Sequence, residues 1–581
     1  MLSLDKNCHY LKTPLHFYWN KRHLHLQHLT IGLHLFFMQR LFHLIKIILS
    51  DKRISVFIVL IAIAGRVIQL VFFYNIRVDH SFQVFATQNF TDGHGISLSY
   101  VLPHDLTTTI YEPLINWPPG YSVLLAPFYI LYGYDYVAAG ITLDIVSGII
   151  FLLVSRQILR VFHIPIYLIN ISTLITGFFI YQFYFVASSD AIAITFFLAA
   201  ILFGLLLLKS SAKWIRNIFL LVISLFLCAF IKYLFMPAVF VIPLFLFAKG
   251  WGMKERYLKE AGIYAFAALA ILLSGLLLYQ KYSSGSAGYI SQPERGFFPE
   301  HLLTAYPFIP AAFIKPDTIG IFINLYSGIG KFIYQLFQII NIIILVIGFI
   351  YFLRRLLKEK LQHGSLTVNF SFIFLLLSGT IILLLGILSV RVAKEVWENN
   401  ILWTYIEESR YYGLLTILAQ LGLFILYHYF RPRQIRFVKY IFFFLLFLLL
   451  VETMRGILLD INRVSKFGKE EYSWQYEKRL QEHTSAIIKN KMRDKGIEHL
   501  VVTGSTYMKS RINLYHRVTV LNDIFSINNV NSVNSKEPAM LFTVLHKKDL
   551  EKFAPFISSD QVEALGNFDN FYFYSLYVYP H

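Results

Sequence analysis

The residues in this sequence best suited to acid–base chemistry are a carboxylate and the imidazole that follows it, Asp79-His80. Asp79 stands only about five residues beyond an apolar run at about 54–74, so it must lie near the surface of any bilayer that this run crosses. A carboxylate there could take a proton from a hydroxyl group on a lipid headgroup or on an external molecule. Aspartate is also a preferred residue at a helix N-terminus, and HSFQVFATQNF after it is a plausible interfacial helix, so capping explains it equally well.

This pair opens an acidic loop, residues 77–121, between two apolar segments. The loop has a single basic residue, Arg77, and four carboxylates: Asp79, Asp92, Asp105 and Glu112. Near its end stands WPPGYSVLLAPF, where Pro118 precedes an apolar helix at a position that does not need its missing N–H group. We expect Glu112 to contact a substrate, and the other acids and histidines beyond His80 to serve loop structure or to contact an acceptor.

Two further polar positions stand at the ends of apolar runs. Asp190, in FVASSDAIAITFFL, is at a helix start, where a carboxylate suits the helix dipole and capping alone could account for it. Lys232-Tyr233, in FIKYLFMP, falls at a turn between two short runs. A buried ammonium is costly there unless it meets an anion, although Lys232 could equally extend to the interface. Both positions are therefore candidates for substrate binding.

A third such position carries both signs of charge. Glu408 and Arg410 open a late apolar run in YIEESRYYGLLTI. A guanidinium suits a phosphate group because its donors form a planar fork and its charge persists, while an interfacial Glu–Arg pair is the structural alternative. Oxygen ligands from Asp190 and Glu408 would suit Mg²⁺ or Mn²⁺, but the sequence does not require a metal.

The composition identifies the class of protein that holds these residues. Of 581 residues, 56% are hydrophobic and 17% aromatic, which a soluble domain could not bury. The apolar residues form runs of roughly 17–25, the length of helix that crosses a ~30 Å hydrocarbon core. The excess of basic residues, a formal charge of +18, falls in short clusters between these runs, which is typical of a cytoplasmic membrane face and not of a nucleic-acid-binding protein. With Cys8 and Cys228 alone, no disulfide framework is proposed.

Hydropathy predicts a polytopic membrane protein with about eleven transmembrane helices. They fall near 54–74, 136–158, 165–186, 190–208, 217–231, 234–248, 261–280, 332–353, 368–390, 411–430 and 437–459, with a shorter apolar piece at 121–133. Every second connecting loop is short and basic, so the positive-inside rule places the N-terminus in the cytoplasm. The acidic loop and the C-terminus then lie outside, on the same side as Asp190, Lys232 and Arg410.

Three regions follow from this pattern. Residues 1–50 form an extension and interfacial lead-in, of which 1–37 are expected to be dispensable with Met38 as the true start. Residues 51–460 form the transmembrane domain, with the first outside loop at 75–120. Residues 461–581 are soluble in composition and mix a helical stretch with strand-like EHLVVTG and AMLFTVLH, which predicts a small α/β domain.

The order and sidedness of these motifs resemble the GT-C superfamily of integral-membrane glycosyltransferases. The motifs are an aspartate just after the first span, ATQNFTDGHGIS, PPGYSVLLAPF, SSDAIAITFFL, FIKYLFMP and SRYYGLLTIL. The resemblance covers about residues 50–430 and is to the branch of protein O-mannosyltransferases and aminoarabinose transferases of lipid A, of bacterial family 39/83 type. It implies a polyprenyl-phosphate sugar donor and inversion at the anomeric carbon.

The resemblance also implies roles for individual residues. Asp79 matches the first-loop catalytic aspartate, Asp190 an acidic residue at the start of the fourth span, and Arg410 the basic residue near the lipid phosphate. The chain departs from both subgroups. It has Asp79-His80 where the mannosyltransferases often have two acids, and NWPPGY where the aminoarabinose transferases have KPPLY, so the lysine position is Asn116 or Trp117 here.

The expected function is transfer of a sugar from a polyprenyl phosphate to an extracytoplasmic hydroxyl group at the bacterial inner membrane. Asp79 would be the general base, and Arg410 and Lys232 would stabilise the departing phosphate. The residues expected to contact substrates are His80, Glu112, Asp190, Lys232, Tyr233, Glu408 and Arg410. A multi-span transporter or lipid flippase is the alternative, followed by a scaffold whose C-terminal domain binds an envelope partner. The sugar stays open, as does the acceptor: a protein, a lipid or a glycan.

Overall fold

The computed structural model describes ten stretches of the chain and a few single positions. The stretches are 46–74, 78–115, 117–178, 189–285, 312–314, 413–430, 436–466, 474–504, 519–521 and 533–580. The N-terminal extension therefore lies almost wholly outside the described residues. So do the spans expected at 332–353, of which single positions are described, and 368–390.

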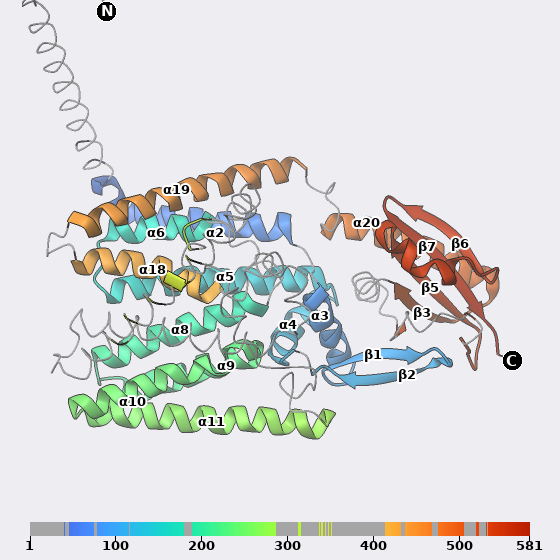
Figure 1. Cartoon of the computed structure of the whole chain (residues 1–581), viewed down its shortest axis with the longest axis horizontal. Helices are drawn as coiled ribbons and strands as arrows, with labels where there is room; N and C mark the ends of the chain where they lie inside the picture. Colours follow the sequence, from blue (N-terminus) through green and yellow to red (C-terminus); the bar gives the residue numbers. More distant parts are fainter. Residues whose placement is uncertain are drawn as a thin grey trace, which may run out of the picture.

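The described part of the transmembrane domain is a bundle of roughly antiparallel helices (Figure 1). Six of them are long and apolar enough to cross a membrane: α2 (Lys52–Phe73), α5 (Tyr136–Val161), α8 (Ser189–Lys209), α9 (Trp214–Ile231), α11 (Arg256–Ser284) and α19 (Arg436–Ser465). Four shorter apolar helices complete it: α4 (Gly120–Leu131), α6 (Ile166–Phe178), α10 (Val241–Met253) and α18 (Gly413–Phe430). The structure thus describes a polytopic helical protein and leaves the predicted count of eleven spans a prediction.

Helix starts follow local chemistry. Asp51 caps α2 by accepting hydrogen bonds from the amides of Arg53 and Ile54, and Asp135 caps α5 in the same way. The span expected at 234–248 begins later, because two short 3₁₀ turns, η1 (Tyr233–Phe235) and η2 (Ala238–Phe240), precede α10. Pro237, which has no N–H group to continue a helical ladder, lies between these turns.

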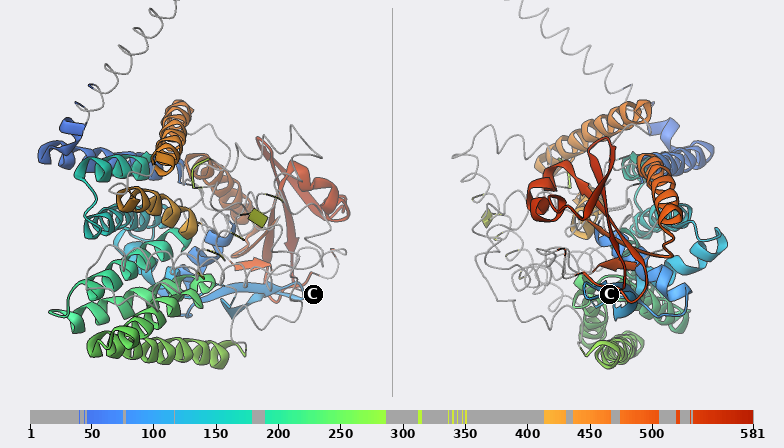
Figure 2. Two further views of the ribbon diagram at one scale, coloured as in Figure 1. Left: turned by 60° about the vertical axis from the view of Figure 1, so that its left-hand side comes forward. Right: turned by 90° about the vertical axis from the view of Figure 1, so that its right-hand side faces the viewer.

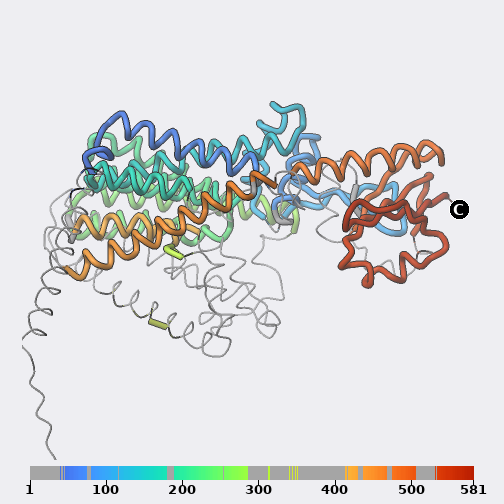
Figure 3. The backbone as a smooth tube through the Cα atoms, turned by 90° about the horizontal axis from the view of Figure 1, so that it is seen from above, coloured from blue at the N-terminus to red at the C-terminus, as the bar shows by residue number. Residues whose placement is uncertain are grey.

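A seven-stranded sheet lies beyond one end of the bundle (Figure 2). Its strands are β1 (Ser97–Leu102), β2 (Asp105–Pro113), β3 (His499–Gly504), β4 (Thr519–Leu521), β5 (Ala539–His546), β6 (Val562–Phe568) and β7 (Phe571–Val578), in the order β2-β1-β4-β3-β5-β7-β6. The four central strands, β1, β4, β3 and β5, are parallel to one another. An antiparallel hairpin stands at each edge, β1 with β2 and β6 with β7. Helix α20 (Trp474–Lys495), which follows α19 along the long axis in Figure 3, packs through Leu480 on one sheet face, and α22 (Ala554–Ile557) packs on the other.

The sheet is larger than the α/β domain predicted at 461–581, because it includes the acidic loop. After helix α3 (Val78–Thr91), the loop forms the β1–β2 hairpin, and β1 pairs with β4 through Tyr100 opposite Val520. The hairpin residues Val101 and Leu106 are buried in one cluster with Val501 and Leu541. The loop and the C-terminal segment therefore share a hydrophobic core.

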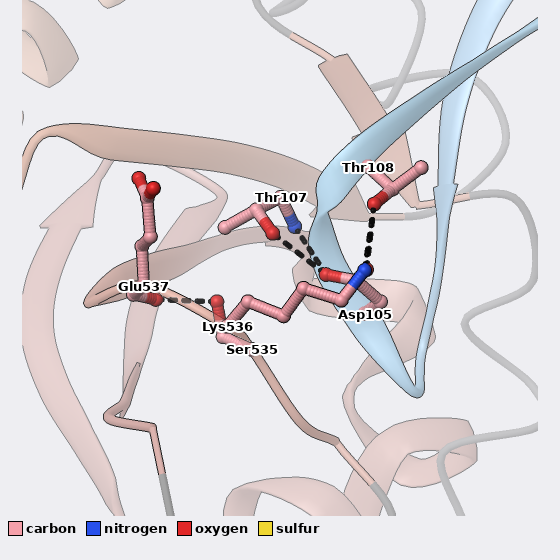
Figure 4. A network of polar contacts seen from close by, with 6 residues as sticks. All are labelled: Asp105, Thr107, Thr108, Ser535, Lys536 and Glu537. Carbon is pink, nitrogen blue, oxygen red and sulfur yellow. Dashed lines mark hydrogen bonds and ion pairs between the residues drawn. The ribbon is translucent and has the colours of Figure 1, made fainter.

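Polar contacts tie the hairpin tip to the same domain (Figure 4). The Asp105 carboxylate accepts hydrogen bonds from the Thr107 and Thr108 hydroxyls at 2.7 and 2.6 Å, and the Lys536 ammonium lies 2.7 Å from it. Two backbone bonds, Leu106 N to Asn534 O and Asn534 N to Pro103 O, run beside them. Asp105 thus contributes to the structure of the loop, one of the two roles expected for it.

We expect the contacts of Asp105 at the hairpin tip to weaken only in acid. The Lys536 ammonium and then the Thr108 and Thr107 hydroxyls hold the pKa of Asp105 well below its usual 3.8. A lowered carboxyl pKa contributes stability that is present above the unfolded pKa and lost as the pH falls toward the folded one. Amide hydrogen exchange at Thr107 should therefore be slower in the wild type than in Asp105→Asn by a constant factor above about pH 5, and the difference should shrink below about pH 4. A difference that shrank between about pH 8 and 5 would contradict this assignment.

Candidate functional site

The sequence-predicted base lies at the end of the bundle that faces the sheet. Asp79 is the second residue of α3, which starts shortly after α2 ends at Phe73. Figure 1 shows α3 and α4 between the long helices and the β1–β2 hairpin. The first turn of α3 therefore stands at the boundary between the apolar bundle and the sheet domain, as the position of Asp79 after the first span predicts.

His80 lies inside the protein, with 3% of its surface exposed. Its Nε2 atom is 2.9 Å from the Tyr74 hydroxyl and 3.4 Å from the Tyr121 hydroxyl, and its ring meets the Tyr121 ring edge-on at 5.0 Å. These contacts join the end of α2, the start of α3 and the start of α4. His80, predicted to contact a substrate, is thus a buried residue that links the start of α3 to α2 and α4.

The rest of α3 is fixed to the elements on either side of it. The Ser122 hydroxyl of α4 donates to the Gln83 carbonyl oxygen at 2.8 Å, and the Asn89 amide donates to the Ser97 carbonyl oxygen of β1 at 2.8 Å. The side chains of Gln83 and Asn89 are buried. Helix α3 is therefore held by α4 on one side and by β1 on the other.

The end of the acidic loop packs directly against α9. A Cβ atom built on Gly120 would lie 2.4 Å from the carbonyl oxygen of Phe230, so only glycine allows this approach. Phe230 is two residues before Lys232 in the chain. The PPGY segment thus brings the acidic loop next to the turn that carries the predicted cation.

Gly120→Ala is expected to lower the midpoint of thermal unfolding of the purified protein, since the new methyl group must push two backbones apart. Overpacking of this kind typically costs about 1–3 kcal/mol. Gly148→Ala in α5 is the matched control, because a Cβ there meets no described atom within 4 Å. Equal losses of thermal stability in the two variants would contradict the close approach.

The predicted residues Asp190 and Lys232 form a buried ion pair. The Lys232 ammonium lies 3.1 Å from Oδ1 and 3.2 Å from Oδ2 of Asp190, and the two side chains are 9% and 1% exposed. Asp190 is in the first turn of α8, and Lys232 follows the last residue of α9. The anion that the burial of Lys232 demands is therefore supplied by Asp190, and Lys232 does not extend to the interface.

The remaining predicted residues are more scattered. Tyr233 follows Lys232, and its hydroxyl accepts a hydrogen bond from the Gln280 amide of α11. Glu112 is exposed on β2, opposite Leu98 of β1. Glu408 and Arg410 lie outside the described residues. The partners that sequence reasoning missed are Tyr74, Tyr121 and Gln280, whose residue types carry no signal of their roles.

A metal site has little support within the described stretches. They contain no group of three His, Cys, Asp or Glu residues that could hold an ion. Of the two ligands suggested by the sequence, Asp190 is engaged by Lys232 and Glu408 falls outside these stretches. The charge of the Asp190 carboxylate is thus already balanced by the Lys232 ammonium.

Comparison with known proteins finds similar solved structures. No protein-family model matches the chain, and no curated protein matches it. The structure of ArnT from Cupriavidus metallidurans bound to undecaprenyl phosphate is 13% identical with a TM-score of 0.45, over 90% of this chain and 98% of that one. Archaeal oligosaccharyltransferase AglB from Archaeoglobus fulgidus, in complex with an inhibitory peptide and a dolichol-phosphate, is 11% identical with a TM-score of 0.47, over 88% and 71%.

A further structure of the Archaeoglobus fulgidus oligosaccharyltransferase, a complex with Zn and sulfate, is 12% identical with a TM-score of 0.48, over 87% of this chain and 69% of that one. The three structures are 11–13% identical to this chain. The case for a function of this chain rests on its own residues.

Proposed function

We propose that this protein is a membrane glycosyltransferase that moves a sugar from a polyprenyl-phosphate donor to an extracytoplasmic hydroxyl group. The observation that supports this best is the meeting of the acidic loop with the α9 turn at Gly120. It brings the segment that carries Asp79 and the turn that carries Lys232 to one end of an apolar bundle. A lipid-linked donor would present its phosphate and sugar at such an end while its chain remains in the bilayer.

Each step of the proposed reaction has a residue suited to it. Asp79 takes the proton of the acceptor hydroxyl as that oxygen attacks the anomeric carbon, with inversion. The bond between the anomeric carbon and the phosphate oxygen breaks through a transition state of oxocarbenium character. Arg410 stabilises the charge that grows on the departing phosphate, since its planar fork suits a phosphate group.

The buried pair changes the proposed role of Lys232. Because Asp190 balances its charge, Lys232 does not act as an isolated cation facing the donor. We assign the pair to holding the α8 and α9 ends together, so that the α9 turn keeps its contact with Gly120. Tyr233, hydrogen-bonded to Gln280, and the exposed Glu112 are left as candidate substrate contacts.

The proposed setting follows from the charge pattern of the loops. The basic loops face the cytoplasm, and the acidic loop, the ends of α8 and α9 that carry the ion pair, and the sheet domain face outward, in a bacterial inner membrane. We propose the transmembrane domain at 51–460 and the C-terminal domain at 461–581 as functional regions. The shared sheet supports a role for the C-terminal domain in holding the acidic loop in place.

The test is transfer of label from a panel of undecaprenyl-phosphate sugars in reconstituted vesicles, with the lipid, glycan and protein acceptors supplied in turn. The same vesicles report movement of the labelled lipid between leaflets. We expect label on an acceptor together with release of undecaprenyl phosphate. Lipid that crosses the bilayer unchanged, with no transfer to any acceptor, would favour the transporter alternative.

A further inference from the structure

The opposite end of the bundle from Asp79 holds a cavity with two arginines. It measures about 440 Å³ and lies between α2, α5 and α8, lined by Ser55, Arg156, Arg160, Val56 and Leu153 among others. Ser55 is in the first turn of α2, whose 22 residues span about 33 Å at 1.5 Å each. The cavity is thus about one bilayer thickness away from the first turn of α3.

The charge of Arg156 is buried, and the side chains that hydrogen-bond to it are neutral. Its side chain is held by the Thr173 hydroxyl at 2.8 Å and by the Ser55 hydroxyl, and the residue is 5% exposed. Ser55 in turn donates to the Asn170 amide oxygen at 3.0 Å. No carboxylate forms an ion pair with Arg156 or Arg160 among the residues that the structure describes. A buried guanidinium of this kind calls for an anion.

The walls of the cavity suit a hydrocarbon chain. Val56 and Leu153 are 61% and 49% exposed on the outside of the bundle, where lipid would surround them. Arg160 is exposed in the last turn of α5, and its guanidinium bonds the Gln157 amide of the same turn at 3.2 Å. The arginines at one end of the cavity and its apolar walls match the phosphate and the acyl chain of a phospholipid.

We propose that this cavity binds an anionic phospholipid of the leaflet opposite the proposed active site. Its phosphate would lie at Arg156 and Arg160, whose forked donors suit phosphate oxygens, and an acyl chain would follow Val56 and Leu153. Free inorganic phosphate would leave the apolar walls without a role. The site is separate from glycosyl transfer and does not depend on the proposed function.

The test is native mass spectrometry of the full-length protein purified in detergent, titrated separately with dioleoylphosphatidylglycerol, dioleoylphosphatidylcholine and inorganic phosphate. We expect the anionic lipid to be retained at least about tenfold more tightly than the zwitterionic one. Arg160→Gln should weaken that retention by about tenfold, the loss expected for a charge-assisted hydrogen bond. Leu153→Trp, which fills the groove, should abolish it.

The controls separate binding from folding. Arg216→Gln removes an exposed arginine outside the cavity and should bind like the wild type. Arg160→Gln and Leu153→Trp, both at exposed positions, should unfold at the wild-type temperature. Arg156 itself is spared because it braces three helices. Equal retention of both lipids, unchanged retention in Arg160→Gln and Leu153→Trp, or binding of inorganic phosphate alone would each overturn the proposal.

Discussion

Lys232→Met should destabilise the protein by about 3–5 kcal/mol, as expected when one partner of a buried ion pair is removed. The reason is the 1% exposure of the Asp190 side chain, which would keep its charge away from water after the ammonium 3.1 Å away is gone. The measurement is the midpoint of denaturation of the purified protein in detergent. Lys281→Met, at an exposed position of α11, is the matched control and should change little.

The double variant Asp190→Asn with Lys232→Met distinguishes the two roles that the pair could have. Removing both charges should recover most of the lost stability, because replacing a buried pair by neutral groups is often close to neutral. If the pair only holds α8 and α9 together, the recovered protein should also recover transfer. A double variant that is stable and inactive would indicate that Lys232 binds the donor phosphate. A double variant as unstable as Lys232→Met would contradict the buried ion pair between Asp190 and Lys232.

Local pattern was sufficient to predict several of the helices that the structure describes. The runs predicted at 190–208 and 217–231 correspond closely to α8 and α9, since a helix that crosses lipid must be apolar along its length. The same reasoning predicted that Lys232 needs an anion. It could not select Asp190, because the two residues meet only when α8 and α9 pack side by side.

The pairing of strands in the sheet could not be predicted from local sequence pattern. Tyr100 and Val520 pair across β1 and β4, yet they come from the first outside loop and the C-terminal segment. A strand pattern gives the alternation of side chains and carries no information on which distant strand it will join. The boundary predicted at 461 therefore separated two pieces of one sheet. Likewise, nothing in the composition or spacing around Tyr74 and Tyr121 marks them as partners of His80.

Asp79→Asn has the largest expected effect on activity. Asparagine keeps the size of the side chain, but it cannot accept the proton of an acceptor hydroxyl. Loss of general-base catalysis typically costs about 10²–10⁴-fold in rate. The fold should be unaffected, since His80 anchors the first turn of α3 through Tyr74 and Tyr121. A structural role for Asp79 at the start of α3, the other explanation, predicts little change in the rate of transfer, because asparagine serves that role nearly as well as aspartate.

The most direct measurement is therefore the initial rate of sugar transfer from an undecaprenyl-phosphate donor, for wild type, Asp79→Asn and Asp92→Asn at equal protein in vesicles. Asp92 is the control in the same loop, about 20 Å along α3 from Asp79 at 1.5 Å per residue. We expect transfer by the wild type and by Asp92→Asn, and a loss of about 10²–10⁴-fold in Asp79→Asn with unchanged melting. Equal rates in wild type and Asp79→Asn would contradict the assignment of Asp79 as the base.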